Sequence, residues 1–565
     1  MRRPSLASWL LALTPAAWLL PNHYPPWVSA WLDGTAMALL AVAALVLRGT
    51  ASVRMPWAWC AAALVVVLSV SAQWATGRVL FAGDALMVLL YVGALVVAIG
   101  LGDAVARQPA AGPVDPRDDA IPAIALGWAA AALLCVAIAL IQWTGVGMPM
   151  EWVADLPPGA RPFSNLAQPN HFSTATVLGV IALAVLRESG RIGSLGFWSG
   201  SAFLLLGMVM SGSRTGWLQL GLAAGLCAWF GRRLKLAVGF KEVMALVAIA
   251  VALQAAWSPL DQVLDRGVDR PLEEKLAGGA RPALWRDSLA AVAREPLLGH
   301  GWQQIGAALQ SVALDRPPQP AFFEHFDHAH NIVLDLLLWA GIPAGGLIAL
   351  LGLVALQGQL RRLQDRRAVW LVIGGLAILL HSLLEFPHTF AYFLVPLGLL
   401  LGMANALSAP GGTWDLPRWS PRAAGAVLAA ALVLVGADYL RAEENFRLAR
   451  LETARIGTSS VGTDVPRLRA LSQLEAYLRF VRTEARAGMS EADLQWMRQV
   501  ALRHGYAPVL FRYALAQGLN GRPDEAARTL KLLCHVHSRR RCNEAREAWP
   551  ALQARHAALR AVPAP

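Results

Sequence analysis

Long, nearly unbroken runs of apolar residues recur along this chain. Ala58 to Val70, Val79 to Leu101 and Ile332 to Leu356 are three of them, and several runs are long enough to cross roughly 30 Å of hydrocarbon as helices. Hydrophobic residues make up 56% of the chain and charged residues 15%, an apolar excess that requires surrounding lipid. A transmembrane β-barrel would alternate polar and apolar residues instead. The sequence therefore predicts an all-α, polytopic membrane protein.

Counting these runs predicts about 13 transmembrane helices. The approximate spans are residues 6 to 20, 35 to 47, 57 to 72, 79 to 101, 121 to 142, 172 to 186, 196 to 211, 214 to 230, 240 to 256, 329 to 356, 368 to 384, 388 to 406 and 422 to 440. The first run follows Arg2 and Arg3, as in a secretory signal peptide. Residues 20 to 27 carry prolines and an Asn-His pair instead of the small residues of a cleavage site, so we expect a retained first helix.

The basic residues are distributed unevenly between the loops. A formal net charge of +12 would also suit a nucleic-acid-binding protein, but Lys and Arg cluster in alternate loops. These clusters hold Arg48, Arg54, Arg187, Arg191, Arg232, Arg233, Lys235, Arg361, Arg362, Arg366, Arg367, Arg418 and Arg422. The positive-inside rule makes these loops and the N-terminus cytoplasmic, and an odd number of spans exports the C-terminus. This pattern favours a multi-pass protein among the lipids of a bacterial inner membrane, with no nucleic-acid partner.

The spans divide the chain into four parts. These are N-terminal transmembrane helices at 1–256, a large periplasmic loop at 257–328, C-terminal transmembrane helices at 329–440 and a soluble periplasmic helical domain at 441–565. The loop is too long for a simple connector, which indicates a functional role. In the last part, Tyr513 to His535 is typical of two helices joined by a turn at Gly518 to Pro523. It is either a tetratricopeptide-like hairpin or part of a generic helical domain.

The five cysteines fall into two groups. Cys60, Cys135 and Cys227 lie within apolar runs, where we expect them to pack as small hydrophobic residues. Cys534 and Cys542 belong to the C-terminal domain, and on the oxidising side of the membrane they can form a disulfide.

Several arginines break the rule that exported loops are poor in positive charge. They are Arg78, Arg161, Arg214, Arg281 and Arg286. The guanidinium is a planar, permanently charged fork that suits bidentate phosphate binding, so arginines at one membrane face indicate a lipid that carries a pyrophosphate. Arg214 lies in a small polar break, Ser211 to Gly216, where an ionisable residue is costly unless it is used. The alternative for each arginine is a contact with lipid headgroups.

Amide side chains follow Arg161 in the loop that leads to the sixth run. Asn165, Gln168 and Asn170 can hydrogen-bond sugar hydroxyls. The alternative is a structural one, in which Asn170 caps the next helix.

The densest cluster of titratable residues is Phe322 to Asn331, at the end of the long loop. His325, His328 and His330, with Asp327 or Glu324, would be the ligands of a metal site. Acid–base catalysis would instead need one neutral imidazole oriented by a partner, and the pKa of histidine suits removal of a proton from a hydroxyl near neutral pH. The spacing is not a specific metal pattern, which favours a general base, and structural hydrogen bonding is a third interpretation.

The chain resembles the bacterial O-antigen ligase and polymerase superfamily, and within it the PglL-type protein O-oligosaccharyltransferases. The resemblance covers most of the chain. The matching pieces are Pro21 to Trp27, Gln73 to Tyr91, Arg161 to Asn170, Ser211 to Gly216, Arg281 to Trp302, His328 to Asn331, His381 to Pro387 and Ala391 to Leu394. The pair His330 and Asn331, separated by nine residues from Gly341, resembles the ligase motif, but Ala344-Gly-Gly346 replaces the Gly-Thr pair that follows in ligases. The later pieces and the C-terminal domain are more similar to the protein-glycosylating branch.

This resemblance implies a donor glycan linked to undecaprenyl diphosphate, a protein acceptor such as pilin, and neither a nucleotide, another cofactor nor an obligatory metal. Arg214 and Arg281 would hold the diphosphate, and His330 would deprotonate the attacking Ser or Thr hydroxyl, with inversion at the anomeric carbon. The other candidates for substrate binding are Arg161, Asn165, Gln168, Asn170, Arg286, His328, Asn331 and Tyr392, and for Tyr392 the alternative is an interfacial aromatic. Rival functions are an O-antigen ligase that acts on lipid A core, an O-antigen polymerase and a transporter of lipid-linked glycan.

Overall fold

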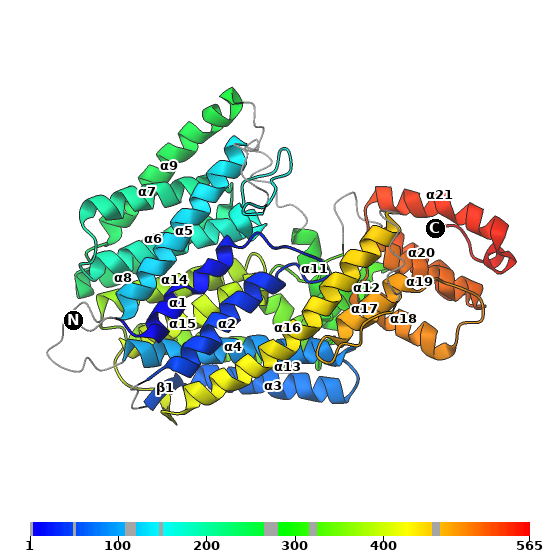
Figure 1. Cartoon of the computed structure of the whole chain (residues 1–565), viewed down its shortest axis with the longest axis horizontal. Helices are drawn as coiled ribbons and strands as arrows, with labels where there is room; N and C mark the ends of the chain where they lie inside the picture. The colour runs from blue at the N-terminus through cyan, green and yellow to red at the C-terminus, as the bar shows by residue number, and fades with distance from the viewer. Residues whose placement is uncertain are drawn as a thin grey trace. The chain divides into compact units, whose positions relative to one another are not determined.

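The computed structural model describes residues 4–48, 52–107, 120–145, 151–264, 281–315, 325–454 and 464–565. These residues are mainly helical, as predicted (Figure 1). The one short sheet of the described residues pairs β1 (Ser52–Pro56) with β2 (Thr413–Pro417) in antiparallel register. Arg2, Arg3 and Glu324, which entered the sequence interpretation, lie outside the described residues.

The chain forms two compact units, each built from separate stretches of sequence. The first unit comprises Met1–Ala63, Leu90–Ala277 and Leu350–Val433, and the second comprises Leu64–Leu89, Gly278–Ala349 and Leu434–Pro565. Four helices contribute to both units: α3 (Trp57–Ala75), α4 (Ala82–Ala106), α13 (Ile332–Arg361) and α16 (Ser420–Thr453).

In the first unit, helix α6 (Pro169–Glu188) occupies the centre of the packing. It contacts α5 (Ala120–Thr144), α7 (Ser194–Met210), α8 (Arg214–Leu234) and α14 (Arg366–Ser382), and most of its side chains are buried. The other elements are α1 (Leu6–Ala12), η1 (Thr14–Leu19), α2 (Ala30–Val46), η3 (Ser164–Leu166), α9 (Phe240–Val263), η4 (Pro387–Thr389) and α15 (Ala391–Ala406).

The second unit combines part of the predicted loop with the predicted C-terminal domain. Its own helices are α11 (Arg281–Arg294), α12 (Ile305–Ala313), α17 (Ser472–Arg482), α18 (Glu491–Arg503), α19 (Ala507–Leu519), α20 (Pro523–Val536), α21 (Arg539–Arg555) and η5 (Ala557–Ala561). Buried apolar residues of successive helices, including Phe480, Met497 and Leu510, form one core of this unit.

Each of the thirteen predicted runs overlaps a helix of the structure. Among the described residues, seven helices are long and apolar enough to cross a membrane: α3, α4, α5, α6, α9, α13 and α16. Shorter apolar helices lie at Leu6–Leu19, Ala30–Val46, Ser194–Met210 and Ala391–Ala406. The chain is therefore a multi-pass membrane protein, and the count of thirteen crossings stays a prediction.

The predicted helical hairpin in the C-terminal part is present as α19 and α20, with the turn at residues 520–522. Its classification as a tetratricopeptide-like unit stays a prediction. Cys534 of α20 and Cys542 of α21 form a disulfide, whereas Cys60, Cys135 and Cys227 are free thiols.

Candidate active site

The polar turn between α7 and α8 presents Arg214 to solvent. Ser213 caps α8 by accepting a hydrogen bond from the amide of Thr215 at 3.3 Å, and Arg214 is the first residue of that helix, with an exposed side chain. The amide N–H groups at a helix N-terminus carry a partial positive charge that adds to the charge of a neighbouring guanidinium. This end of α8 is therefore suited to an anion.

Arg161 contacts the same turn. Its Nη1 donates to the carbonyl oxygens of Ser211 at 3.1 Å and Gly212 at 3.2 Å. Two arginines that are far apart in the sequence thus belong to one local structure, in which Arg161 supports the turn that carries Arg214.

The amides after Arg161 have structural partners. Asn165 is fully buried; its Nδ2 donates to the carbonyls of Leu19 and Trp152, both at 2.8 Å, and its Oδ1 accepts from the amide of Ala154 at 2.9 Å. These contacts favour a role for Asn165 in holding the loop. The cap of α6 is Gln168, whose side chain accepts from the amide of His171 at 2.9 Å. The capping role considered for Asn170 is therefore wrong.

Asn170 and Tyr392 join α6 to the segment His381 to Leu394. The Nδ2 of Asn170 donates to Glu385 Oε1 at 2.9 Å, and the hydroxyl of Tyr392 lies 2.9 Å from His171 Nδ1. Tyr392 is only 2% exposed, so the alternative of an interfacial aromatic is wrong. Its hydroxyl bonds inside the first unit, which favours a positioning role.

In the second unit, helix α13 is broken at Gly341. This residue has φ +75°, and a Cβ added there would lie 2.4 Å from the carbonyl oxygen of Leu297. The chain approaches so closely because the amide of Ile342 donates to Pro296 O at 2.7 Å and that of His300 to Leu338 O at 2.7 Å. Glycine at 341 is thus required by backbone conformation and by contact with the Pro296 to Trp302 segment.

Gln73 hydrogen-bonds both α13 near its break and the Pro296 to Trp302 segment. Its Nε2 donates to the carbonyls of Leu298 at 2.7 Å and Trp339 at 2.8 Å, and its Oε1 accepts from the amide of Trp302 at 3.1 Å. Gln73, the Pro296 to Trp302 segment and the helix break are three pieces of the family resemblance, and they form one hydrogen-bonded structure.

Asn331 caps the first half of α13, and His330 directly precedes the cap. Asn331 Oδ1 accepts from the amides of Val333 at 3.0 Å and Leu334 at 3.2 Å. His330 has a left-handed backbone with φ +54°, and its half-buried ring lies 5.7 Å from that of Phe326. A non-glycine residue in this conformation is costly and is often found at functional sites.

Arg281 lies on the face of α11 that meets the histidine segment. Trp285, one helical turn after Arg281, donates through Nε1 to the carbonyl of Ala329 at 3.0 Å. Because residues four apart share a helix face, Arg281 projects from the side of α11 that contacts the residue before His330. Arg286 is exposed on the same helix.

The other two histidines of the segment face carboxylates. His325 Nε2 lies 3.2 Å from Asp327 Oδ1, and His328 Nδ1 lies 4.0 Å from Asp335 Oδ2. The buried Asp335 also accepts from the amide of Ala329 at 2.6 Å. The described residues contain no group of three potential ligands arranged to hold a metal ion.

An ion network, buried at Asp84 and partly exposed at Asp327, extends from this segment into the C-terminal domain; the sequence interpretation missed it. Arg503 donates to Asp84 Oδ2 at 3.1 Å and to Asp327 Oδ1 at 3.3 Å, and Gln304 donates to Asp84 at 3.3 Å. Desolvation opposes the charged form of Asp327, but His325 and Arg503 outweigh it and hold the pKa of this carboxyl well below its usual range. The sequence signal for this network is Asp84, a charged residue inside the predicted span 79–101.

Arg78 has a structural role as well. Its Nη1 lies 3.1 Å from Glu295 Oε2 and donates to the carbonyl of Gly299 at 3.0 Å, so it holds the segment that packs on the break of α13.

Two family models match successive stretches of the chain. The model of the O-antigen ligases matches residues 199–351, which include the Arg214 turn, Arg281 and His330, and that of the C-terminal region of virulence-factor membrane-bound polymerases matches residues 368–550. Over these residues the chain is similar to the O-antigen ligases and to the membrane-bound polymerases, and it is a glycosyltransferase.

The chain is also similar to two O-oligosaccharyltransferases from Acinetobacter baylyi. The chain is 26% identical over 537 residues to a protein named general O-oligosaccharyltransferase, across 93% of this chain and 91% of the relative. It is 29% identical over 253 residues to a ComP-specific O-oligosaccharyltransferase, across 43% of each chain.

Proposed function

We propose that this protein transfers an oligosaccharide from an undecaprenyl-diphosphate-linked donor to Ser or Thr hydroxyls of a pilin-like protein in the periplasm. The observation that carries the proposal is the match to a general O-oligosaccharyltransferase over 93% of the chain. That match extends through most of the C-terminal domain, which an enzyme that acts on lipid would not obviously need.

The donor diphosphate is bound by arginines. Arg214 is exposed at the N-terminus of α8, on a turn that Arg161 supports, and Arg281 projects from the side of α11 next to the histidine segment. Bidentate guanidinium contacts stabilise the negative charge that grows on the diphosphate as its bond to the sugar breaks.

His330 is the general base. It takes the proton from the acceptor hydroxyl while the hydroxyl oxygen forms a bond to the anomeric carbon and the diphosphate leaves with the electron pair of the broken C–O bond. Attack from the side opposite the leaving group inverts the configuration. Of the three histidines, only His330 directly precedes Asn331 in the motif that resembles the ligases, which favours His330 for this role. Neither a metal nor another cofactor has a part in this mechanism.

The proposed orientation places the N-terminus in the cytoplasm of a bacterial inner membrane. Residues 257–328 and 441–565 lie in the periplasm, and the two groups of membrane helices occupy 1–256 and 329–440. The disulfide between Cys534 and Cys542 supports export of the C-terminal domain, because disulfides persist in oxidising compartments.

A ligase or polymerase is the second candidate, favoured by the descriptions of the two matching family models. Its acceptor would be lipid A core or another glycan.

The test mixes the purified full-length protein, reconstituted in a lipid bilayer, with a lipid-linked oligosaccharide and either a pilin or lipid A core. Mass spectrometry of the digested pilin should find the glycan on Ser or Thr, and the reaction should be lost with His330→Ala. Transfer to lipid A core alone, with unmodified pilin, would reject the proposal in favour of the ligase.

A further inference from the structure

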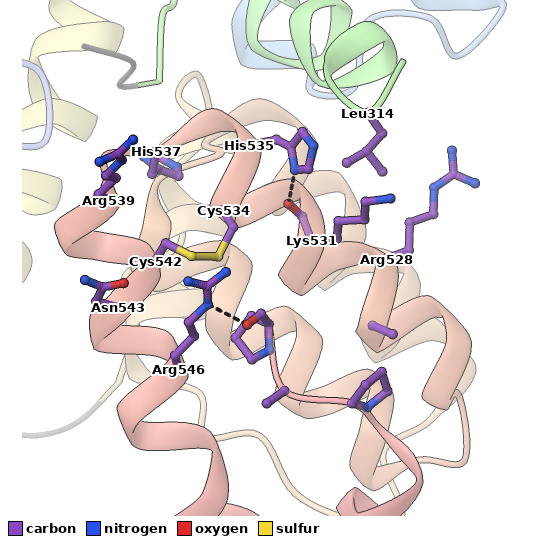
Figure 2. Close-up of a pocket in the computed structure, with 14 residues that line it drawn as sticks. Leu314, Arg528, Lys531, Cys534, His535, His537, Arg539, Cys542, Asn543 and Arg546 are labelled. Atoms are coloured by element: carbon purple, nitrogen blue, oxygen red, sulfur yellow. Dashed lines mark hydrogen bonds between the residues drawn. A yellow bond between two sulfur atoms is a disulfide. The ribbon is translucent and has the colours of Figure 1, made fainter. Parts of the chain in front are cut away.

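Helices α20 and α21 enclose a hollow of about 960 Å³ in the C-terminal domain (Figure 2). We name it the basic hollow. It is lined by Leu314, Ala527, Arg528, Lys531, Cys534, His535, His537, Arg539, Cys542, Asn543, Arg546 and Pro563–Pro565. We infer that the basic hollow binds an acidic segment of the protein acceptor, an assignment that rests on the proposed function.

The basic side chains that line the hollow, with the amide of Asn543, come from one face of each helix. Arg528, Lys531 and His535 follow one another at spacings of three and four along α20, and Arg539, Asn543 and Arg546 do so at four and three along α21. Such spacings place side chains on the same helix face. Figure 2 shows both sets around the hollow, with the disulfide between them.

No Asp or Glu side chain is among the residues that line the hollow. Two acidic side chains of these helices are engaged by other residues: Glu544 accepts from Arg540 at 3.0 Å and Arg541 at 2.8 Å, and Glu525 accepts from Gln517 at 3.1 Å. Within the described parts of the chain, Arg528, Lys531 and Arg539 have no ion pair. These three side chains can therefore pair with an external anion.

The two cationic faces are held together before any ligand arrives. Cys534 lies between Lys531 and His535 on α20, Cys542 lies beside Asn543 on α21, and their disulfide joins the two helices at the wall of the hollow. Arg546 Nε donates to the terminal oxygen of Pro565 at 2.7 Å, which holds residues 563–565 against α21. A site held in its binding geometry loses less conformational entropy when it binds.

An acidic peptide matches this chemistry better than a membrane surface does. Arg and Lys bind carboxylates through charge-assisted hydrogen bonds, and a volume near 1,000 Å³ is ample for several side chains. Leu314, Ala527 and Pro563 add apolar wall for the stems of those side chains. Binding to anionic lipid instead uses a basic helix face with large apolar residues that insert beside it, and the lining of the hollow has no large aromatic.

The experiment uses the full-length protein in nanodiscs of zwitterionic lipid, with a fluorescein-labelled peptide of alternating Glu and Ala as probe. Fluorescence anisotropy should show binding that weakens as salt is raised. The double variant Arg528→Glu/Lys531→Glu should raise the Kd roughly tenfold or more. A probe of alternating Gln and Ala should not bind.

The matched control is Arg555→Glu/Arg560→Glu, which makes the same change of charge at exposed positions of the same domain outside the hollow. It should leave the Kd within about twofold of the wild type. Equal weakening by both variants, or no binding of the acidic probe to the wild type, would overturn the assignment. Loss of probe binding in nanodiscs that contain phosphatidylglycerol would show that anionic lipid occupies the hollow instead.

Transfer assays separate this inference from the proposed function. With pilin as acceptor, the double variant should raise KM for pilin while leaving kcat near the wild-type value. If the wild type modifies pilin and the double variant has unchanged KM, the hollow is not the acceptor site and the proposed function stands. If no protein is modified although the acidic probe binds, the proposed function fails and the hollow keeps only its anion-binding role.

Discussion

Arg503, the last residue of α18, donates to Asp327 at 3.3 Å in the segment that leads to His330. The same guanidinium contacts Asp84, which is 2% exposed. Arg503, which belongs to the C-terminal domain, thereby holds the segment that leads to His330. The proposed base follows Asp327 by three residues. We therefore expect the C-terminal domain to help position the proposed base.

Arg503→Lys should lower kcat by roughly tenfold or more, because one ammonium cannot reproduce the fork that bridges two carboxylates and a small displacement of a catalytic group is costly. KM for the donor should change little, since the guanidinium of Arg503 is engaged by Asp84 and Asp327. Steady-state kinetics on the reconstituted enzyme measure both quantities. Arg498→Lys, at an exposed position of the same helix, is the control. Equal effects of the two substitutions would reject the positioning role.

His330→Ala should lower turnover by roughly 100-fold or more, the usual effect of losing a positioned general base, and leave binding of donor lipid largely intact. His328→Ala should be milder, because His328 faces the buried Asp335. Single-turnover assays and a lipid-binding assay separate the two steps. Near wild-type activity in His330→Ala with an inactive His328→Ala would mean that the base is misassigned. Activity that is abolished by EDTA and restored by a divalent metal would favour the metal interpretation.

Arg214→Lys and Arg281→Lys should each lower kcat/KM by roughly 100-fold, although the charge is kept, because bidentate geometry to the diphosphate is lost. The control is Arg232→Lys, at an exposed position near the other end of α8. Initial rates with the lipid-linked donor decide the matter, and full activity in both variants would leave these arginines with a structural or lipid-facing role.

Gly341→Ala should destabilise the protein by roughly 1–3 kcal/mol, because φ is +75° and the new Cβ would meet Leu297 O at 2.4 Å. Gly346→Ala lies on the same helix with no atom within 4 Å of the added Cβ, so it should be neutral or slightly stabilising. Apparent Tm in detergent compares the two variants. A Gly341→Ala protein as stable as Gly346→Ala would contradict the requirement for glycine at the break of α13.

Acid should weaken the C-terminal domain through His504. Burial is the main cause that lowers the pKa of this imidazole from 6.5 to about 3, and the positive charge of Arg503 adds to it. The unfolded chain therefore takes up a proton below pH 6.5, whereas the folded chain does so only near pH 3. The free energy of unfolding should thus fall as pH drops through this window.

The measurement compares apparent Tm at neutral pH and near pH 5 for the wild type, for His504→Gln and for His556→Gln, which alters an exposed histidine. His504→Gln should lose less stability on acidification than the other two proteins do. An identical loss in all three would remove His504 as the cause.

The membrane helices were predictable because an apolar run of sufficient length has few alternatives in lipid. The spacing from Asn331 to Gly341 was also visible, and the structure supplies its reason: one residue caps the first half of α13 and the other permits its break. The Arg503–Asp84 pair was not predictable, since its members are 419 positions apart and no local pattern links them. Gln168 rather than Asn170 caps α6 because the helix begins at Pro169, two residues earlier than a cap at Asn170 would require.

The disulfide between Cys534 and Cys542 also bears on how the protein is made. Only eight positions separate the two cysteines, yet they belong to different helices, so the bond sets the relative placement of α20 and α21. Copies whose C-terminal domain stays among reducing thiols would fold without this constraint. If the C-terminal domain is exported, we expect assembly of the basic hollow to depend on export, and the reduced protein to bind an acidic peptide less well than the oxidised protein does.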